Sequence, residues 1–172
     1  GAVNCLLSTT HFDNNIFTGN RANTGGAIYN QQNTNTLSNN TFYKNSAGLG
    51  GGYCSRFSST SILNNNIFWG NDASGNTNTV GADFASLNSS VNTFRNNLLQ
   101  LGSTLYTTVG SGNYDLGIAA VGNIFNLNPE FADSNDIDGV DNILRTTDDG
   151  LNLQSSSPAK DAGDNSLIPV NV

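Results

Sequence analysis

Short apolar patches alternate with asparagine and glycine along the chain, and the alternation repeats. The pattern Phe-Asp-Asn-Asn-Ile-Phe at 12–17 matches 37–42, 63–68 and 94–99, and matches 120–125 more weakly. The last position of each copy moves from Phe17 to Phe42, Phe68, Leu99 and Phe125, in steps of 25, 26, 31 and 26 residues. A repeat of this length is typical of a stacked solenoid.

A second motif keeps the same register. Three copies continue as Phe-x-x-Asn, ending at Asn20, Asn45 and Asn71. Two of these are followed by Gly-Gly and an apolar residue, at 25–28 and 50–53, and Gly-Ala-Asp-Phe at 81–84 follows the third five residues late. An insertion in the loop 71–80 therefore explains the 31-residue step.

These repeats predict an all-β fold, a parallel β-helix of about six coils. No single unit can bury its apolar residues alone, whereas stacked units bury them against their equivalents. We expect coils at 1–125 and, in the same domain, a terminal coil and capping segment at 126–172. Two inward columns are predicted, Phe17, Phe42, Phe68, Leu99, Phe125 and Phe12, Leu37, Leu63, Phe94, beside an asparagine ladder of Asn15, Asn40, Asn66, Asn97, Asn123.

The composition supports this interpretation and excludes some partners. The chain has 30 asparagines among 172 residues, and only 11% of its residues are charged. Its net charge is −7 with six Lys and Arg, which disfavours nucleic acid because few cations are available for phosphates. No apolar run approaches the length of about 18 residues that a membrane helix needs, so we expect no membrane insertion, and we expect a monomer.

The repeat resembles a known group of exported proteins. Phe-x-x-Asn followed by Gly-Gly-Ala-Ile is similar to the repeat of chlamydial polymorphic outer membrane proteins. Phe-Trp-Gly-Asn at 68–71, Asn-Pro-Glu-Phe at 128–131 and Ser-Pro-Ala-Lys-Asp-Ala-Gly at 157–163 resemble secreted β-helix repeat proteins of Bacteroidetes-type bacteria. The resemblance implies an extracellular or cell-surface location and, with the usual sense of parallel crossovers, a right-handed helix. Because the chain opens within a repeat, we interpret it as part of a longer protein.

Enzymatic sites are poorly represented, so we expect a module without catalytic residues. Residues 1–120 hold only Asp13, Asp72, Asp83 and Asp115 as carboxylates, and the repeat register places them in different columns. A glycosidase needs two carboxylates a few ångströms apart. A fragment of a polysaccharide lyase or glycoside hydrolase, completed by flanking coils, remains the first alternative. Cys5 and Cys54 lie one column and two coils apart, too far for a disulfide, so two free thiols are predicted.

Two surfaces are candidates for binding. Tyr43 and Trp69 follow the stacked Phe column and should face outward, one above the other beside Lys44. Exposed flat rings suit the apolar faces of sugars, which makes these three residues the predicted glycan-binding site; packing of Trp69 under the loop 71–80 is the alternative. Two neighbouring outward rows, Thr9, Thr34, Thr60, Val91 and His11, Thr36, Ile62, Thr93, resemble an imperfect ice-binding face. Ice binding and a purely structural stalk are the further alternatives.

The acid is concentrated near the C-terminus, where eight of the twelve Asp lie between 133 and 164. The alternating Asp136, Asp138 and Asp141, with a glycine turn and the later Asp148 and Asp149, resemble a calcium loop, but position 145 is Arg where an EF-hand has Glu. A structural Ca²⁺ is therefore predicted, and a solvated acidic loop is the alternative.

The favoured interpretation is a secreted or cell-surface, adhesin-like β-helix that binds carbohydrate.

Overall fold

The computed structural model of this protein describes residues 1–77, 81–100, 108–109 and 122–168. In that part of the chain the strands pair in parallel, no α-helix is present, and one 3-10 turn, η3 (Asn165–Leu167), lies near the end. Sheet A contains β1 (Val3–Leu6), β4 (Ile28–Gln31), β8 (Tyr53–Arg56), β12 (Phe84–Leu87) and β15 (Thr108–Val109). Sheet B contains β2 (Thr9–Asp13), β5 (Thr34–Ser38), β9 (Thr60–Asn64) and β13 (Val91–Arg95). Sheet C contains β3 (Ile16–Thr18), β6 (Thr41–Tyr43), β10 (Ile67–Trp69), β14 (Leu98–Leu99) and β16 (Ile124–Phe125), and a small sheet D pairs β7 (Ser46–Ala47) with β11 (Asp72–Ala73).

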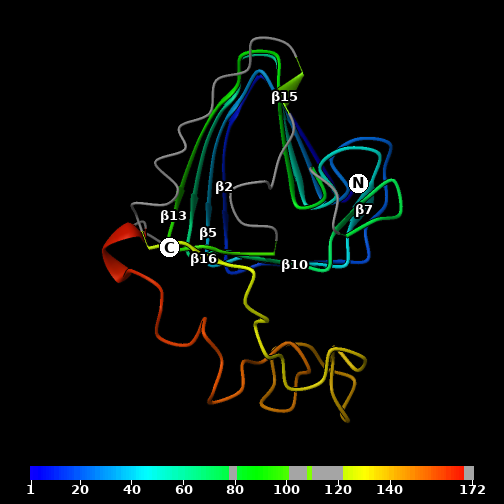
Figure 1. Ribbon diagram of the computed structural model, residues 1–172, viewed down its shortest axis with the longest axis vertical. Coiled ribbons are helices and arrows are strands. Elements are labelled where there is room, and N and C mark those ends of the chain that lie inside the picture. Colours follow the sequence, from blue (N-terminus) through cyan, green and yellow to red (C-terminus); the bar gives the residue numbers. More distant parts are fainter. Residues whose placement is uncertain (78–80, 101–107, 110–121, 169–172) are drawn as a thin grey trace.

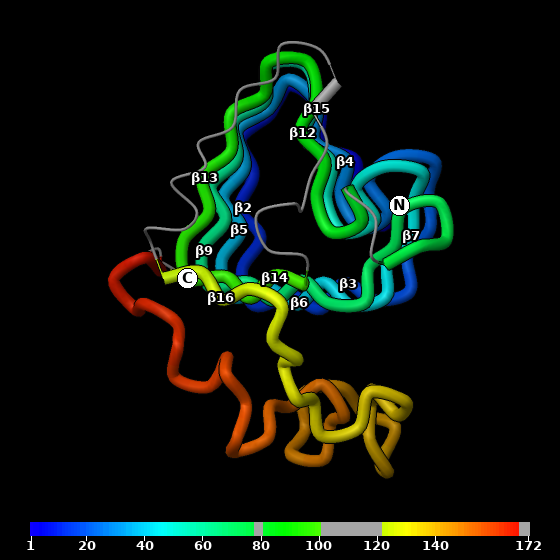
Figure 2. The backbone as a smooth tube through the Cα atoms, viewed as in Figure 1, coloured from blue at the N-terminus to red at the C-terminus, as the bar shows by residue number. Residues whose placement is uncertain are grey.

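The strands wind into a right-handed parallel β-solenoid, which confirms the predicted fold class. Sheets A, B and C form the three sides of a triangle, with sheet D in a lobe at one corner (Figure 1). Each coil passes down sheet B, along sheet C and up sheet A, counter-clockwise in this view. Later coils lie nearer the viewer, which makes the winding right-handed (Figure 2). The described residues complete about four turns rather than six, because the chain after β16 no longer winds with the coils.

The predicted core columns form as the repeat requires. Phe17, Phe42 and Phe68 pair in register, and their rings stack with centroids 4.9 and 4.3 Å apart. Leu99 and Phe125 continue the column. The second column, Phe12, Leu37, Leu63, Phe94, is likewise in register across sheet B. Like side chains therefore meet at the interstrand spacing, where offset aromatic pairs are favourable.

Each Asn-Asn pair turns the corner between sheets B and C. The first residue of each pair has a positive φ, which asparagine tolerates better than most residues: Asn14, Asn39, Asn65 and Asn96, with φ from 52° to 58°. The second residue builds the predicted ladder, in which the backbone N–H and Nδ2 of one rung donate to Oδ1 of the next: Asn15, Asn40, Asn66, Asn97, Asn123. The first asparagine is chosen for backbone conformation and the second for hydrogen bonding.

The glycine pairs precede β4 and β8, at the corner where the chain enters sheet A. Gly25 has a φ of +63°, and a Cβ atom there would lie 2.5 Å from the carbonyl oxygen of Ile28. A Cβ on Gly26 would lie 2.2 Å from the carbonyl oxygen of Gly51 in the next coil. The first glycine is required by the positive φ and the second by the close approach of stacked backbones.

Polar side chains fill the interior near the junction of sheets A and B, which the apolar pattern did not predict. Tyr53 Oη lies 2.7 Å from Ser61 Oγ and accepts a hydrogen bond of 3.3 Å from Asn35 Nδ2. Asn92 Nδ2 donates to Ser86 Oγ at 2.8 Å. Hydrogen bonds across the interior of a coil and between neighbouring coils thus pair many of these buried amides and hydroxyls.

The chain after β16 forms an irregular segment, the strap (residues 126–168), which packs along the outer face of sheet C rather than over the end of the last coil (Figure 1). Its apolar side chains Phe131, Ile137, Leu151 and Leu153 contact the outward-facing Tyr43, Ile67 and Trp69. Its hydrogen bonds reach all four coils, joining Arg145 to Asn14, Ser134 to Tyr43, Asp164 to Asn65 and Ala162 to Asn96. The strap therefore runs along the solenoid and adds a second, smaller core outside it.

Candidate functional site: a crevice between the strap and the solenoid

The aromatic pair predicted as a binding platform lies beneath the strap. Tyr43 and Trp69 pair in register and face outward from sheet C, as the strand alternation predicts. Tyr43 is nevertheless only 3% exposed, because Phe131 packs edge-on against its ring at 5.4 Å. Trp69 is half-buried in the same cluster, where the strap provides apolar partners. The alternative cover, the loop 71–80, lies partly outside the described residues. The two rings are walls of a crevice and not an open platform.

Lys44 holds the strap against this wall. Its Nζ lies 4.8 Å from the centre of the Tyr43 ring and donates a 3.5 Å hydrogen bond to the carbonyl oxygen of Ser134. The Tyr43 hydroxyl donates to the same oxygen at 3.3 Å. The structure thus brings Tyr43, Trp69 and Lys44 together, as the sequence predicts, and adds a covering segment that the sequence did not reveal.

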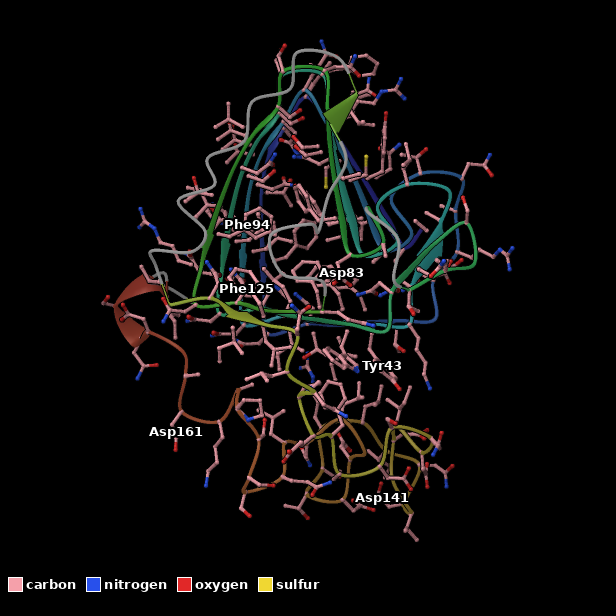
Figure 3. All side chains as sticks on the ribbon, viewed as in Figure 1. Tyr43, Asp83, Phe94, Phe125, Asp141 and Asp161 are labelled. Atoms are coloured by element: carbon pink, nitrogen blue, oxygen red, sulfur yellow. The ribbon has the colours of Figure 1, made fainter. Side chains whose placement is uncertain are left out.

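The strap and sheet C border a polar crevice of about 230 Å³, which we call the strap crevice. Tyr43 lies on the side of sheet C that faces the strap (Figure 3). The crevice walls combine three aromatic rings with amide, hydroxyl and carboxylate groups: Tyr43, Trp69, Asn128, Glu130, Phe131, Ser134, Gln154. This volume lies below the range of about 300–1,000 Å³ typical of pockets for drug-sized ligands, so it suits a small polar ring.

Local hydrogen bonds position the polar groups of the strap crevice. Asn128 Oδ1 accepts from the backbone N–H of Glu130 at 2.9 Å, which fixes a tight turn. Glu130 Oε2 accepts from the hydroxyl of Ser156, and Gln154 Nε2 donates to the carbonyl oxygen of Phe131 at 3.1 Å. Phe131 and Leu153 form an antiparallel bridge that joins the two sides of the strap. The crevice is therefore a built site. The repeat predicts Tyr43 and Trp69 as binding residues, whereas the motif Asn-Pro-Glu-Phe at 128–131 was noted only for its resemblance and was given no role, because the strap belongs to no repeat.

The carboxylates of the coils lie in three different columns, as the register predicts. Asp13 pairs with Ser38 in sheet B and Asp72 with Ser46 in sheet D. Asp83 lies immediately before β12 in sheet A, and Asp115 lies outside the described residues.

Asp83 ends a second asparagine ladder. Asn20 Nδ2 donates to Asn45 Oδ1, and Asn45 Nδ2 donates to Asn71 Oδ1. Asn71 Nδ2 then donates to Asp83 Oδ1 at 2.8 Å, so a carboxyl takes the place of the next amide. Burial raises the pKa of Asp83 from its usual 3.8 to about 7, against the lowering effect of hydrogen bonds from Asn71 and the backbone of Gln100.

The acidic residues of the strap act mainly on its own backbone. Asp148 Oδ2 accepts from the N–H of Asp141, and Asp149 accepts from the N–H groups of Arg145 and Thr146. Within the part of the chain that the structure describes, no group of three or more His, Cys, Asp or Glu is arranged to hold a metal ion. The calcium ligands predicted at Asp136, Asp138, Asp141, Asp148 and Asp149 stay a prediction.

Both cysteines are free and buried, which confirms the predicted thiols. Cys5 pairs with Asn30 and lies in the core, whereas Cys54 pairs with Tyr29 and lies under a small outer cluster. Burial raises the pKa of both thiols, that of Cys54 to about 12. Thiolate chemistry is therefore disfavoured at either site.

The threonine rows on sheet B lie where the repeat places them. Thr9, Thr34, Thr60 and Val91 are exposed and in register.

No helix in the described ranges is long and apolar enough to cross a membrane. Comparison of the chain with protein-family models, with curated proteins and with solved structures finds no match in any of the three.

Proposed function

We propose that this protein is a non-catalytic, adhesin-like module of a secreted or cell-surface protein, and that it binds carbohydrate in the strap crevice. The observation that carries the proposal is the composition of the crevice wall. Trp69 and Tyr43 present aromatic surface, while Asn128, Glu130 and Gln154 present hydrogen-bonding groups within the same small volume. A sugar ring has an apolar face and a rim of hydroxyls, and these two kinds of wall match both parts.

The scarcity of other chemistry supports a binding role. Asp83 is the one carboxyl of the described coils that is buried, and its oxygens accept hydrogen bonds within the fold. Glu130 lies beside Ser156 and not beside a second acid in the crevice. Glycoside hydrolysis by paired carboxylates therefore finds no counterpart among the crevice residues. A bound sugar would be held and released unchanged.

A glycan-array screen of the intact protein tests the proposal. We expect wild type to bind a subset of glycans. Glu130→Gln should weaken binding at least about tenfold because it removes a charge-assisted hydrogen bond to the sugar. Trp69→Leu should weaken it to a similar extent because it removes a stacked ring. Gln at 130 can still accept from Ser156, and Leu at 69 keeps apolar contact with the strap. Asp161→Asn is the matched control, because it removes an exposed strap carboxylate that does not line the crevice.

The same screen separates the alternatives. Binding that survives both crevice variants would place the glycan elsewhere and sink the assignment of the site. No binding to any glycan would leave the structural-stalk interpretation. Loss of wild-type binding on adding EDTA would make the predicted calcium part of recognition.

A further inference from the structure

Three large aliphatic side chains project from the far end of the strap. Val140, Ile143 and Leu144 are 87%, 60% and 51% exposed, and we call them the aliphatic tip. They lie within five residues of one another, around Asp141, which Figure 3 shows at the end of the strap away from the coils. A single exposed aliphatic residue is ordinary, but three on one short turn form a patch of the kind that marks interaction sites.

Hydrogen bonds and close backbone contacts within residues 139–148 hold the aliphatic tip in its exposed position. Asp141 Oδ1 accepts from the N–H of Ile143 at 2.8 Å, and the N–H of Asn142 donates to the carbonyl oxygen of Gly139 at 3.2 Å. Gly139 packs so closely that a Cβ there would lie 2.6 Å from the carbonyl oxygen of Asp148. Carboxylates and backbone thus close the loop from inside, which leaves the aliphatic side chains to point out.

Apolar residues next to this segment are buried against the solenoid, unlike the three residues of the aliphatic tip. Ile137 and Leu151, on either side of the loop, pack against the Tyr43–Phe131 cluster. Leu151 is 8% exposed. The apolar side chains of this segment therefore divide into a buried set that holds the strap and an exposed set that belongs to none of the hydrophobic clusters of the described residues.

Charge identifies the kind of partner. Asp133, Asp136, Asp141 and Asp148 are all exposed on the segment 133–149 that carries the tip, with Arg145 as the one cation of these residues. An anionic membrane would be repelled by this acidic segment, and a second copy would bring the same negative charge to the contact. A surface with an apolar centre and a basic rim would be complementary in both respects.

We propose that the aliphatic tip is a docking site for a protein partner that presents an apolar patch ringed by Lys and Arg. The site is separate from the strap crevice and does not depend on carbohydrate binding. A second copy of this chain carries a net charge of −7, so the basic partner is a different molecule.

The probe for the experiment is a synthetic amphipathic peptide of Leu and Lys, titrated into the intact ¹⁵N-labelled protein and followed by NMR. We expect saturable shifts confined to residues 136–148, and binding that weakens with salt. The triple variant Val140→Ser, Ile143→Ser, Leu144→Ser should raise the Kd at least about tenfold, as expected for loss of a few buried aliphatic contacts. Leu127→Ser is the matched control, because Leu127 is 52% exposed but lies outside this loop.

Two further arms decide the chemistry. Asp133→Asn with Asp136→Asn should weaken binding and reduce its dependence on salt, while a peptide with Glu in place of Lys should not bind. Equal binding to the triple variant, or shifts spread over other acidic residues, would overturn the proposal. So would tip-dependent binding to phosphatidylcholine vesicles in preference to the peptide, because the tip would then be a membrane anchor.

Discussion

The coils and the strap solve the same problem by opposite means. In the coils, the ladder asparagines bond to the equivalent residue of the next coil, 25 to 31 residues away, as when Asn40 Nδ2 donates to Asn66 Oδ1 at 3.0 Å. In the strap, polar groups find partners a few residues away, as when Asp149 accepts from Thr146. Repetition makes the first kind of bonding cooperative along the axis, whereas the second kind holds each turn by itself. The comparison predicts that damage spreads in the coils and stays local in the strap.

The largest effect is expected from Phe42→Ala. Phe42 is fully buried between the rings of Phe17 and Phe68, so its removal leaves a cavity in the central column. We expect the free energy of unfolding to fall by about 3–5 kcal/mol, measured by urea titration with circular dichroism. Phe57→Ala is the control, because Phe57 is 36% exposed. Equal losses in the two variants would contradict a core built on the column.

The next effect concerns the pH dependence set by Asp83. Its pKa is about 7 in the folded protein and 3.8 otherwise, so its stabilising contribution is complete below pH 3.8 and is lost as pH rises through 7. The loss is at most about 4 kcal/mol, at 1.36 kcal/mol per pH unit.

Asp83→Asn should remove this slope in unfolding free energies measured across that range. Asp148 and Asp164 have lowered pKa values, chiefly through hydrogen bonds from Thr146 and Ser166, so their contribution is lost only as pH falls below 3.8. They are the same in both proteins, and the difference between the two curves isolates Asp83. Parallel curves would show that this carboxyl titrates normally.

A smaller loss is expected from breaking the asparagine ladder. Asn66 accepts from the N–H and Nδ2 of Asn40 and donates to Asn97 and to the backbone of Leu37. Asn66→Ala leaves these groups unpaired, and we expect a cost of about 2–3 kcal/mol in chemical denaturation. Asn15→Ala, at the first rung with fewer and partly exposed bonds, should cost less. A reversed order would argue against a continuous ladder.

The smallest effect on the coils is expected from Phe131→Ala, which should release the strap. Phe131 contacts Tyr43 from outside the solenoid, so hydrogen exchange should accelerate across residues 126–168. Exchange in the sheet B strands should stay unchanged, and the unfolding free energy of the coils should change by less than about 1 kcal/mol. Acceleration throughout β5 and β9 would show that strap and coils unfold together.

The registers were predictable because a repeat places like side chains at like positions. The columns of Phe17 and Phe12 and the ladder of Asn15 follow from spacing alone. Allowing for a five-residue insertion in 71–80 brings β12 into register with β8. The polar interior around Tyr53 and Ser61 was not predictable from an apolar pattern, since its hydrogen bonds form only when sheets A and B face each other across the interior of a coil.

The strap was predictable only in part. Its acidic turns were visible in the sequence, but nothing in a non-repeating segment shows which face of the solenoid it covers. The prediction of six coils counted this segment as coil, whereas Phe131 and Leu151 instead find their apolar partners on the outside of sheet C. The repeat predicts the outward positions of Tyr43 and Trp69, whereas the motif at 128–131 gives no sign in the sequence that it covers them.

The most direct test of carbohydrate binding uses the fluorescence of Trp69, the single tryptophan of the chain and a wall of the strap crevice. The intact protein is titrated with a panel of neutral and amino monosaccharides, beside Glu130→Gln and Asp161→Asn. The proposed function predicts a saturable change in emission with at least one sugar, weakened at least about tenfold in Glu130→Gln and unchanged in Asp161→Asn. No saturable change with any sugar, or the same affinity in all three proteins, would contradict the crevice as a sugar site.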